Sequence, residues 1–241
     1  MSELPEPITL DTERLGSKGE EVLNVLKSMI VGQDEACEAI ARSLQLTYSG
    51  LANPNRPRLV ILLAGTTGTG KSFTAHCLAQ ALFGNPDDLV MVDCGALGKS
   101  SEHVAGASLL GSPAGYIGHN STTPLLSPKN INRLRSIKPT RYNSDGEKEE
   151  LVSEAIIVFD EIEKASDSTC QVMLSLMDTG MVTLGSNQQV DLRCSILILT
   201  SNVGSAQAQH FQESGAMGFV DEQKSSDDLI HSEIKRRWSP E

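Results

Sequence analysis

The chain has 241 residues, of which 39% are hydrophobic and 21% are charged, and its formal net charge is −11. This length supports a hydrophobic core that needs no disulfide or metal. Such an acidic chain lacks the clustered positive charge of a nonspecific nucleic-acid or anionic-membrane binder. No apolar run approaches the roughly 18 residues of a transmembrane helix, and the acidic N-terminus is unlike a secretory signal. We therefore expect a cytoplasmic protein with no nucleic-acid or membrane partner.

The hydrophobic pattern predicts helices and strands in alternation. Residues 1–19 show little periodicity and are interpreted as a flexible tail. In chain order we expect a helix at 20–30, a helix at 34–48 capped by Asp34, a strand at 59–64, a helix at 71–83, and strands at 89–92, 156–159 and 195–200. The first strand (LVILLA) is apolar throughout, which is typical of a strand buried on both faces. The sequence therefore predicts an α/β domain over residues 20–241, with a mostly parallel sheet flanked by helices.

Two further segments have distinctive composition. Residues 142–150 (YNSDGEKEE) predict a solvated acidic loop, and residues 180–192 predict a short hairpin with residues 185–187 at its tip. The five cysteines are far apart and lack the spacing of metal ligands. We expect reduced, mostly buried thiols and no zinc site.

A phosphate-binding loop is predicted at residues 65–72 (GTTGTGKS), which match G-x-x-x-x-G-K-[ST]. The motif lies between a predicted strand and a predicted helix, as this chemistry requires. Its glycines allow backbone N–H groups to surround phosphate oxygens, and the helix adds its positive N-terminal end. We expect Lys71 to contact the β- and γ-phosphates and the Ser72 hydroxyl to bind Mg²⁺.

Two carboxylates follow the predicted strand 156–159. In isolation, Asp160 and Glu161 are also compatible with a helix cap. At the carboxyl edge of a parallel sheet, where ligands bind, and beside a phosphate loop, Asp160 is expected to hold Mg²⁺ and Glu161 to activate the attacking water. Together the two motifs predict a P-loop NTPase.

The chain resembles the AAA+ superfamily, and within it the second ATPase ring of Clp-type protein unfoldases and disaggregases, over roughly residues 20–241. The resemblance is carried, in order, by residues 31–36 (VGQDEA), 50–57 (GLANPNRP), 65–72, 111–118 (GSPAGYIG), 159–165 (FDEIEKA) and 199–204 (LTSNVG). The chain departs from the family pattern at Thr66, Ser72, residues 119–123 and a longer segment around 141–154.

The resemblance implies an ATP- and Mg²⁺-binding site. Glu161, Asn202 and Lys71 match the family's catalytic positions, with Asn202 orienting water near the γ-phosphate. Ser72 and Asp160 match its metal ligands. The implied nucleotide-binding residues are Val31, Gly32, Thr67, Gly68, Thr69, Gly70, Lys71, Ser72, Phe73 and Asp160, of which Val31 and Gly32 belong to the segment that packs on adenine.

The same resemblance implies a hexameric ring that threads protein substrates through a central pore. Tyr116 and Ile117 match the first pore loop, where an aromatic side chain grips extended polypeptide. Taken alone, Tyr116 is also compatible with a turn residue packed on its own domain. The hairpin at 180–192 is either a second pore loop or a plain surface hairpin. Met217, Gly218 and Phe219 either dock on a Clp-type peptidase or pack on the domain.

We therefore expect the ATP-binding and ATP-hydrolysing core of a ring-forming protein unfoldase. The alternatives are a nucleic-acid-remodelling ATPase of the same superfamily and a nucleotide-gated binding module without turnover. In the family, an arginine finger, a fifth strand and a helical lid would come after Glu241, and Arg236 and Arg237 do not match the finger. We accordingly expect a sheet truncated before its last strand, and a chain that by itself binds nucleotide but hydrolyses it poorly.

Overall fold

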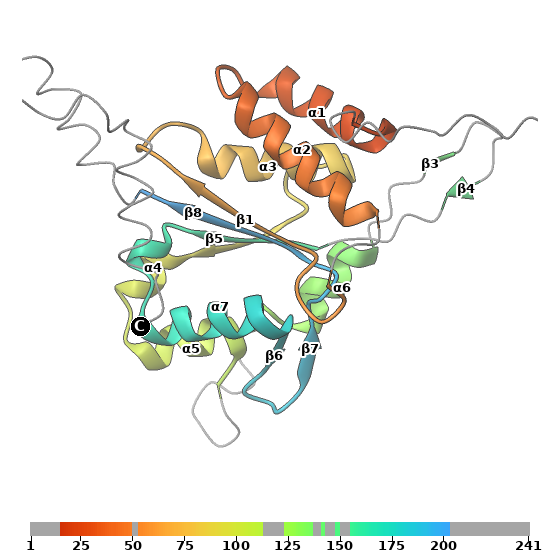
Figure 1. Ribbon diagram of the computed structural model, residues 1–241. Coiled ribbons are helices and arrows are strands. Elements are labelled where there is room, and N and C mark those ends of the chain that lie inside the picture. Colours follow the sequence, from red (N-terminus) through yellow and green to blue (C-terminus); the bar gives the residue numbers. More distant parts are fainter. Residues whose placement is uncertain are drawn as a thin grey trace, which may run out of the picture.

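The computed structural model describes residues 15–49, 53–112, 123–136, 141–142, 148–149 and 155–202 (Figure 1). In these ranges a four-stranded sheet has the order β1-β8-β5-β2, and all of its neighbouring strands pair in parallel. The strands are β1 (Leu59–Ala64), β2 (Val90–Asp93), β5 (Ile156–Asp160) and β8 (Ile196–Ser201). Each of the four predicted strands is present within one residue of its expected ends, and the parallel α/β prediction is confirmed.

Helices cover both faces of this sheet (Figure 1). On one face lie α1 (Ser17–Met29), α2 (Asp34–Tyr48) and α3 (Lys71–Phe83), whose apolar side chains form one core with Ile156, Val158, Ile196 and Ile198. On the other face a second core contains Ile157, Phe159, Leu197 and Leu199. It is closed by α4 (Cys94–Gly98), α5 (Glu102–Leu110), α6 (Pro128–Ser136) and α7 (Asp167–Thr179). Alternate residues of β5 and β8 therefore enter two separate cores.

Strand β1 differs from its prediction because it lies at the edge of the described sheet. Val60 and Leu62 are each 41% exposed, whereas Leu59, Ile61 and Leu63 pack on the core beneath α1–α3. The described helices of the other face cover β2, β5 and β8 but not β1. The expectation that this strand is buried on both faces is therefore wrong in the described part of the chain.

The helix boundaries follow the apolar pattern closely, with two differences. Helix α1 begins at Ser17, before the expected Glu20, and α2 begins at Asp34 with Gln33 as its N-cap residue. Asp34 is thus the first helical residue and not the N-cap, which is Gln33, and the Gln33 side chain makes no capping hydrogen bond. Helix α3 occupies the predicted residues, between Gly70 and Gly84, which are both left-handed.

The predicted hairpin is present as β6 (Met181–Thr183) and β7 (Gln189–Asp191), which pair antiparallel. Its tip contacts the end of α5, because the Gly185 N–H donates to the Leu110 carbonyl at 2.8 Å. At the start of and within the segment predicted as an acidic loop (residues 142–150), β3 (Arg141–Tyr142) and β4 (Lys148–Glu149) form a short antiparallel pair.

All five cysteine thiols are free, and Cys37, Cys77 and Cys94 are buried, as predicted. Within the described ranges, no helix has the length and apolar character needed to cross a membrane.

Candidate nucleotide-binding site

The predicted site residues gather where β1, β5 and β8 end. Ala64 pairs with Ser201 at the end of β1 and β8, and Asp93 pairs with Asp160 at the end of β2 and β5. Because all four strands are parallel, their carboxyl ends meet at one edge of the sheet, beside the N-terminus of α3. This edge brings together residues that are more than 80 positions apart in the sequence, such as Ser72 and Asp160.

The phosphate loop connects β1 to α3 and contains Thr67, Gly68 and Thr69. Gly68 and Gly70 have φ angles of 85° and 86°, which residues other than glycine rarely adopt. The Lys71 ammonium donates to the carbonyl oxygens of Gly65 (3.0 Å) and Thr66 (2.7 Å). These bonds hold the lysine against the loop at the start of α3.

Two opposing effects act on the pKa of Lys71. Burial lowers the pKa of its ammonium group, since a low-dielectric environment disfavours the charged form. The carboxylates of Glu163, Asp160 and Glu161, in decreasing order of effect, act in the opposite direction. The phosphate-loop lysine therefore lies in the field of three carboxylates.

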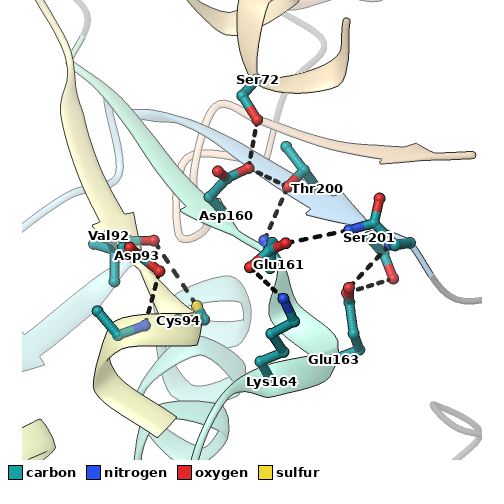
Figure 2. A network of polar contacts seen from close by, with 12 residues as sticks. Ser72, Val92, Asp93, Cys94, Asp160, Glu161, Glu163, Lys164, Thr200 and Ser201 are labelled. Atoms are coloured by element: carbon teal, nitrogen blue, oxygen red, sulfur yellow. Dashed lines mark hydrogen bonds and ion pairs between the residues drawn. The ribbon is translucent and has the colours of Figure 1, made fainter. Parts of the chain in front are cut away.

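Asp160 lies between two hydroxyl groups (Figure 2). Its Oδ1 accepts a hydrogen bond from Ser72 Oγ at 2.7 Å and another from Thr200 Oγ1. A carboxylate and a serine hydroxyl are hard oxygen ligands of the kind that bind Mg²⁺ while it keeps several waters. The described residues contain no group of three or more His, Cys, Asp or Glu that could hold a metal. The two oxygen donors, Ser72 Oγ and Asp160 Oδ1, fit the chemistry of a magnesium ion.

Glu161 has an unusual backbone conformation at the end of β5. Its φ and ψ of 55° and 52° are left-handed, which costs about 1–3 kcal/mol for such a residue and is typical of functional sites. Its N–H donates to Thr200 Oγ1 at 3.0 Å. Its carboxylate accepts from Lys164 Nζ at 2.8 Å and from Asn202 Nδ2 at 3.4 Å. The hydrogen bond to Glu161 is also the main reason that the pKa of Lys164 is raised.

Several residues of this network were not singled out in the sequence. Thr200 bridges Asp160 and Glu161, and Glu163 accepts from Ser201 Oγ and Asn202 N–H. Gly95 lies so close that an added Cβ would be 2.8 Å from Glu161 Oε2. The sequence signals for these residues are a threonine at the end of a buried strand and a second glutamate two residues after Glu161. Neither signal assigns a role by itself, because the contacts depend on which strands are neighbours.

The remaining predicted nucleotide-binding residues lie in the α1–α2 connection and in the first turn of α3. Val31 is 92% exposed and Gly32 has a φ of 75°, both in the connection between α1 and α2. Phe73, in the first turn of α3, is 50% exposed. Tyr116, Ile117 and the segment 217–219 lie outside the described residues.

The parallel sheet, the glycine loop at the start of α3 and the acidic end of β5 define a P-loop nucleotide-binding domain. The family described as "AAA domain (Cdc48 subfamily)" matches residues 56–241. The chain belongs to this family, and membership implies nucleotide binding.

Similar proteins agree with this assignment. The chain is 30% identical over 220 residues to the negative regulator of genetic competence ClpC/MecB of Bacillus subtilis, covering 90% of this chain and 24% of that protein. It is 35% identical over 180 residues to chaperone protein ClpB 1 of Thermosynechococcus vestitus, covering 75% of this chain and 18% of that protein. The chain therefore spans about a quarter of these relatives or less.

The structural comparison leads to the same group. The S. cerevisiae Hsp104:casein complex in its extended conformation is similar with a TM-score of 0.69 and 29% identity, covering 96% of this chain and 34% of that chain. A closed-state Hsp104 structure with ATPγS and FITC casein also has a TM-score of 0.69 and 29% identity, covering 95% of this chain and 35% of that chain. The predicted AAA+ fold and Clp-type resemblance are confirmed.

Proposed function

We propose that this chain is the ATP-binding and ATP-hydrolysing core of a ring-forming protein unfoldase. The observation that carries the proposal is the position of Glu161. The Glu161 carboxylate accepts a hydrogen bond from the Asn202 amide. Glu161 directly follows Asp160, which accepts a hydrogen bond from Ser72 at the start of α3. A base beside a phosphate site is what hydrolysis requires.

In this proposal each side chain has one task. The loop N–H groups and Lys71 hold the β- and γ-phosphates, for which the Lys71 ammonium exchanges its bonds to the loop carbonyls. Ser72 and Asp160 hold Mg²⁺, which neutralises charge on the phosphates when bound. Glu161 accepts a proton from the attacking water, and the Asn202 amide orients that water. Val31, Gly32 and Phe73 contact the base and sugar.

The substrate and assembly are also proposals. Two similar Hsp104 structures contain casein, which supports a polypeptide substrate for this chain. We propose a homo-hexamer in which Tyr116 and Ile117 grip the polypeptide in a central pore, and a Clp-type peptidase that binds residues 217–219. The acidic composition, with reduced thiols, supports a cytoplasmic location.

The test separates binding from turnover in the 241-residue chain, with phosphate release measured under single-turnover conditions because this chain is expected to hydrolyse ATP poorly by itself. Glu161→Gln should bind a fluorescent ATP analogue within about 2-fold of the wild type while phosphate release falls at least ~100-fold, because the base is lost. Lys71→Ala should weaken binding itself, and Lys129→Ala, an exposed residue of α6, should change neither. Unchanged turnover in Glu161→Gln would contradict the assignment of the base.

Two alternatives are distinguished by the same assays. A wild-type chain that binds ATP and releases no phosphate even under single-turnover conditions indicates a nucleotide-gated module. Turnover that is stimulated by DNA and not by casein indicates a nucleic-acid ATPase. The proposed unfoldase requires the opposite preference.

A further inference from the structure

Glu163 makes two contacts to the end of β8 that the proposed reaction does not use. It lies in the short 3₁₀ helix η1 (Ile162–Lys164). Its Oε1 accepts from the Asn202 N–H at 3.2 Å, and its Oε2 accepts from Ser201 Oγ at 3.0 Å. Both oxygens of one carboxylate therefore hold consecutive residues, the last residue of β8 and the residue after it, as Figure 2 shows for Ser201.

These contacts begin where the β5–β8 ladder ends. The ladder between β5 and β8 runs from Ile156↔Ile196 to Phe159↔Leu199 and goes no further. Beyond it, the two strand ends are joined through side chains, by the Glu161 N–H bond to Thr200 Oγ1 and then by the bonds to Glu163. Bonds to a charged acceptor are roughly twice as strong as neutral ones. Glu163 thus extends the connection between the strands past the last ladder pair.

Asn202, which Glu163 holds, is also the residue that contacts the proposed base Glu161. The Asn202 side chain donates to Glu161 Oε1, and its own N–H is bonded to Glu163. The other end of η1 is fixed as well, because the Lys164 N–H donates to the Glu161 carbonyl at 2.8 Å. Glu161, Glu163 and Asn202 therefore form a closed loop of contacts.

The charge of Glu163 acts on the same site. Among the carboxylates that oppose the burial-induced lowering of the Lys71 pKa, Glu163 has the largest effect. The side chain that holds Asn202 is therefore close enough to the phosphate loop for its charge to act on Lys71. A purely structural link elsewhere on the domain would have no such effect.

We propose that Glu163 is a positioning residue that holds the end of β8 so that the Asn202 amide stays on the Glu161 carboxylate. This inference rests on the proposed function, since it assigns Glu163 to the hydrolytic step. It acts through Asn202 and does not contact the reacting atoms.

The test removes the charge and keeps the shape. A glutamine at position 163 can accept the Asn202 N–H with its single oxygen only while its NH₂ group faces the Ser201 hydroxyl, and neither bond then has a charged acceptor. Glu163→Gln should lower kcat for ATP hydrolysis by about 10- to 100-fold, as expected for a misplaced group, with nucleotide affinity changed less than about 3-fold. Glu20→Gln, which changes an exposed residue of α1, is the matched control and should leave both values unchanged.

A double-mutant cycle separates positioning from general stability. In an Asn202→Ala background, Glu163→Gln should have almost no further effect on kcat, because the group that it positions is gone. An equal loss of kcat in both backgrounds, or an unchanged kcat in the single variant, overturns the inference.

A second readout does not depend on turnover. Hydrogen exchange at the Asn202 N–H, followed by NMR in the 241-residue chain, should be slow in the wild type and at least about 10-fold faster in Glu163→Gln. An Asn202 amide that is equally protected in both overturns the inference. Faster exchange in a chain without any ATP turnover supports the contact and instead contradicts the proposed function.

Discussion

Helix α4 lies so close to the turn after β5 that its last residue has no room for a side chain. A Cβ added at Gly98 would lie 1.9 Å from the carbonyl oxygen of Lys164. The obstacle is backbone, which cannot rotate away as the end of a flexible side chain can. We therefore predict that Gly98→Ala pushes α4 away from η1, the turn that carries Glu163.

The magnitude follows from the size of the overlap. The 1.9 Å contact is roughly 1.5 Å shorter than the 3.4 Å at which ordinary contact begins. Overpacking of this kind costs about 1–3 kcal/mol or more, which for a domain of this size lowers the melting temperature by roughly 2–4 °C per kcal/mol. We therefore expect Gly98→Ala to melt about 2–12 °C below the wild type.

The matched control is a glycine in the neighbouring helix. A Cβ added at Gly106 of α5 meets no atom within 4 Å, and alanine is preferred over glycine in a helix by about 1 kcal/mol. Gly106→Ala should therefore raise the melting temperature by a few degrees, measured by circular dichroism in the same buffer. If the two variants melt at the same temperature, the close approach of α4 to η1 is refuted.

Two further predictions concern buried groups. Thr200→Val should lower the free energy of unfolding by about 1–3 kcal/mol, measured by urea unfolding, because the Glu161 N–H loses its acceptor and Asp160 loses a donor. The control Thr183→Val, at an exposed position, should change the free energy of unfolding by less than about 0.5 kcal/mol. Equal changes in the two variants would contradict the role of the Thr200 hydroxyl. Burial raises the pKa of the Cys94 thiol to about 12. Mass spectrometry should therefore find Cys94 unmodified by iodoacetamide at pH 8 in the folded chain and modified in urea, and rapid labelling of the folded chain would contradict the burial. The free energy of unfolding should also fall as the pH rises above about 9, because only the unfolded chain ionises this thiol there.

The sequence by itself determined the local features of the nucleotide site. The glycine loop, the start of α3 at Lys71 and the acidic end of β5 depend on glycine dihedral angles and on short apolar runs, which are properties of neighbouring residues. For the same reason the α3 boundaries matched their prediction. Asp34 did not cap α2, because a cap also depends on the conformation of the residue before the helix, which is Gln33 here.

The tertiary structure decided which residues meet. The strand order β1-β8-β5-β2 makes β8 the neighbour of both β1 and β5, so Thr200 reaches Asp160 and Glu163 holds Asn202. These contacts join residues about 40 positions apart, and no local pattern specifies them. The same order leaves β1 at the edge of the described sheet, where Val60 and Leu62 are partly exposed. Composition and periodicity specify the strands, but the packing of one strand beside another decides which polar side chains complete the site.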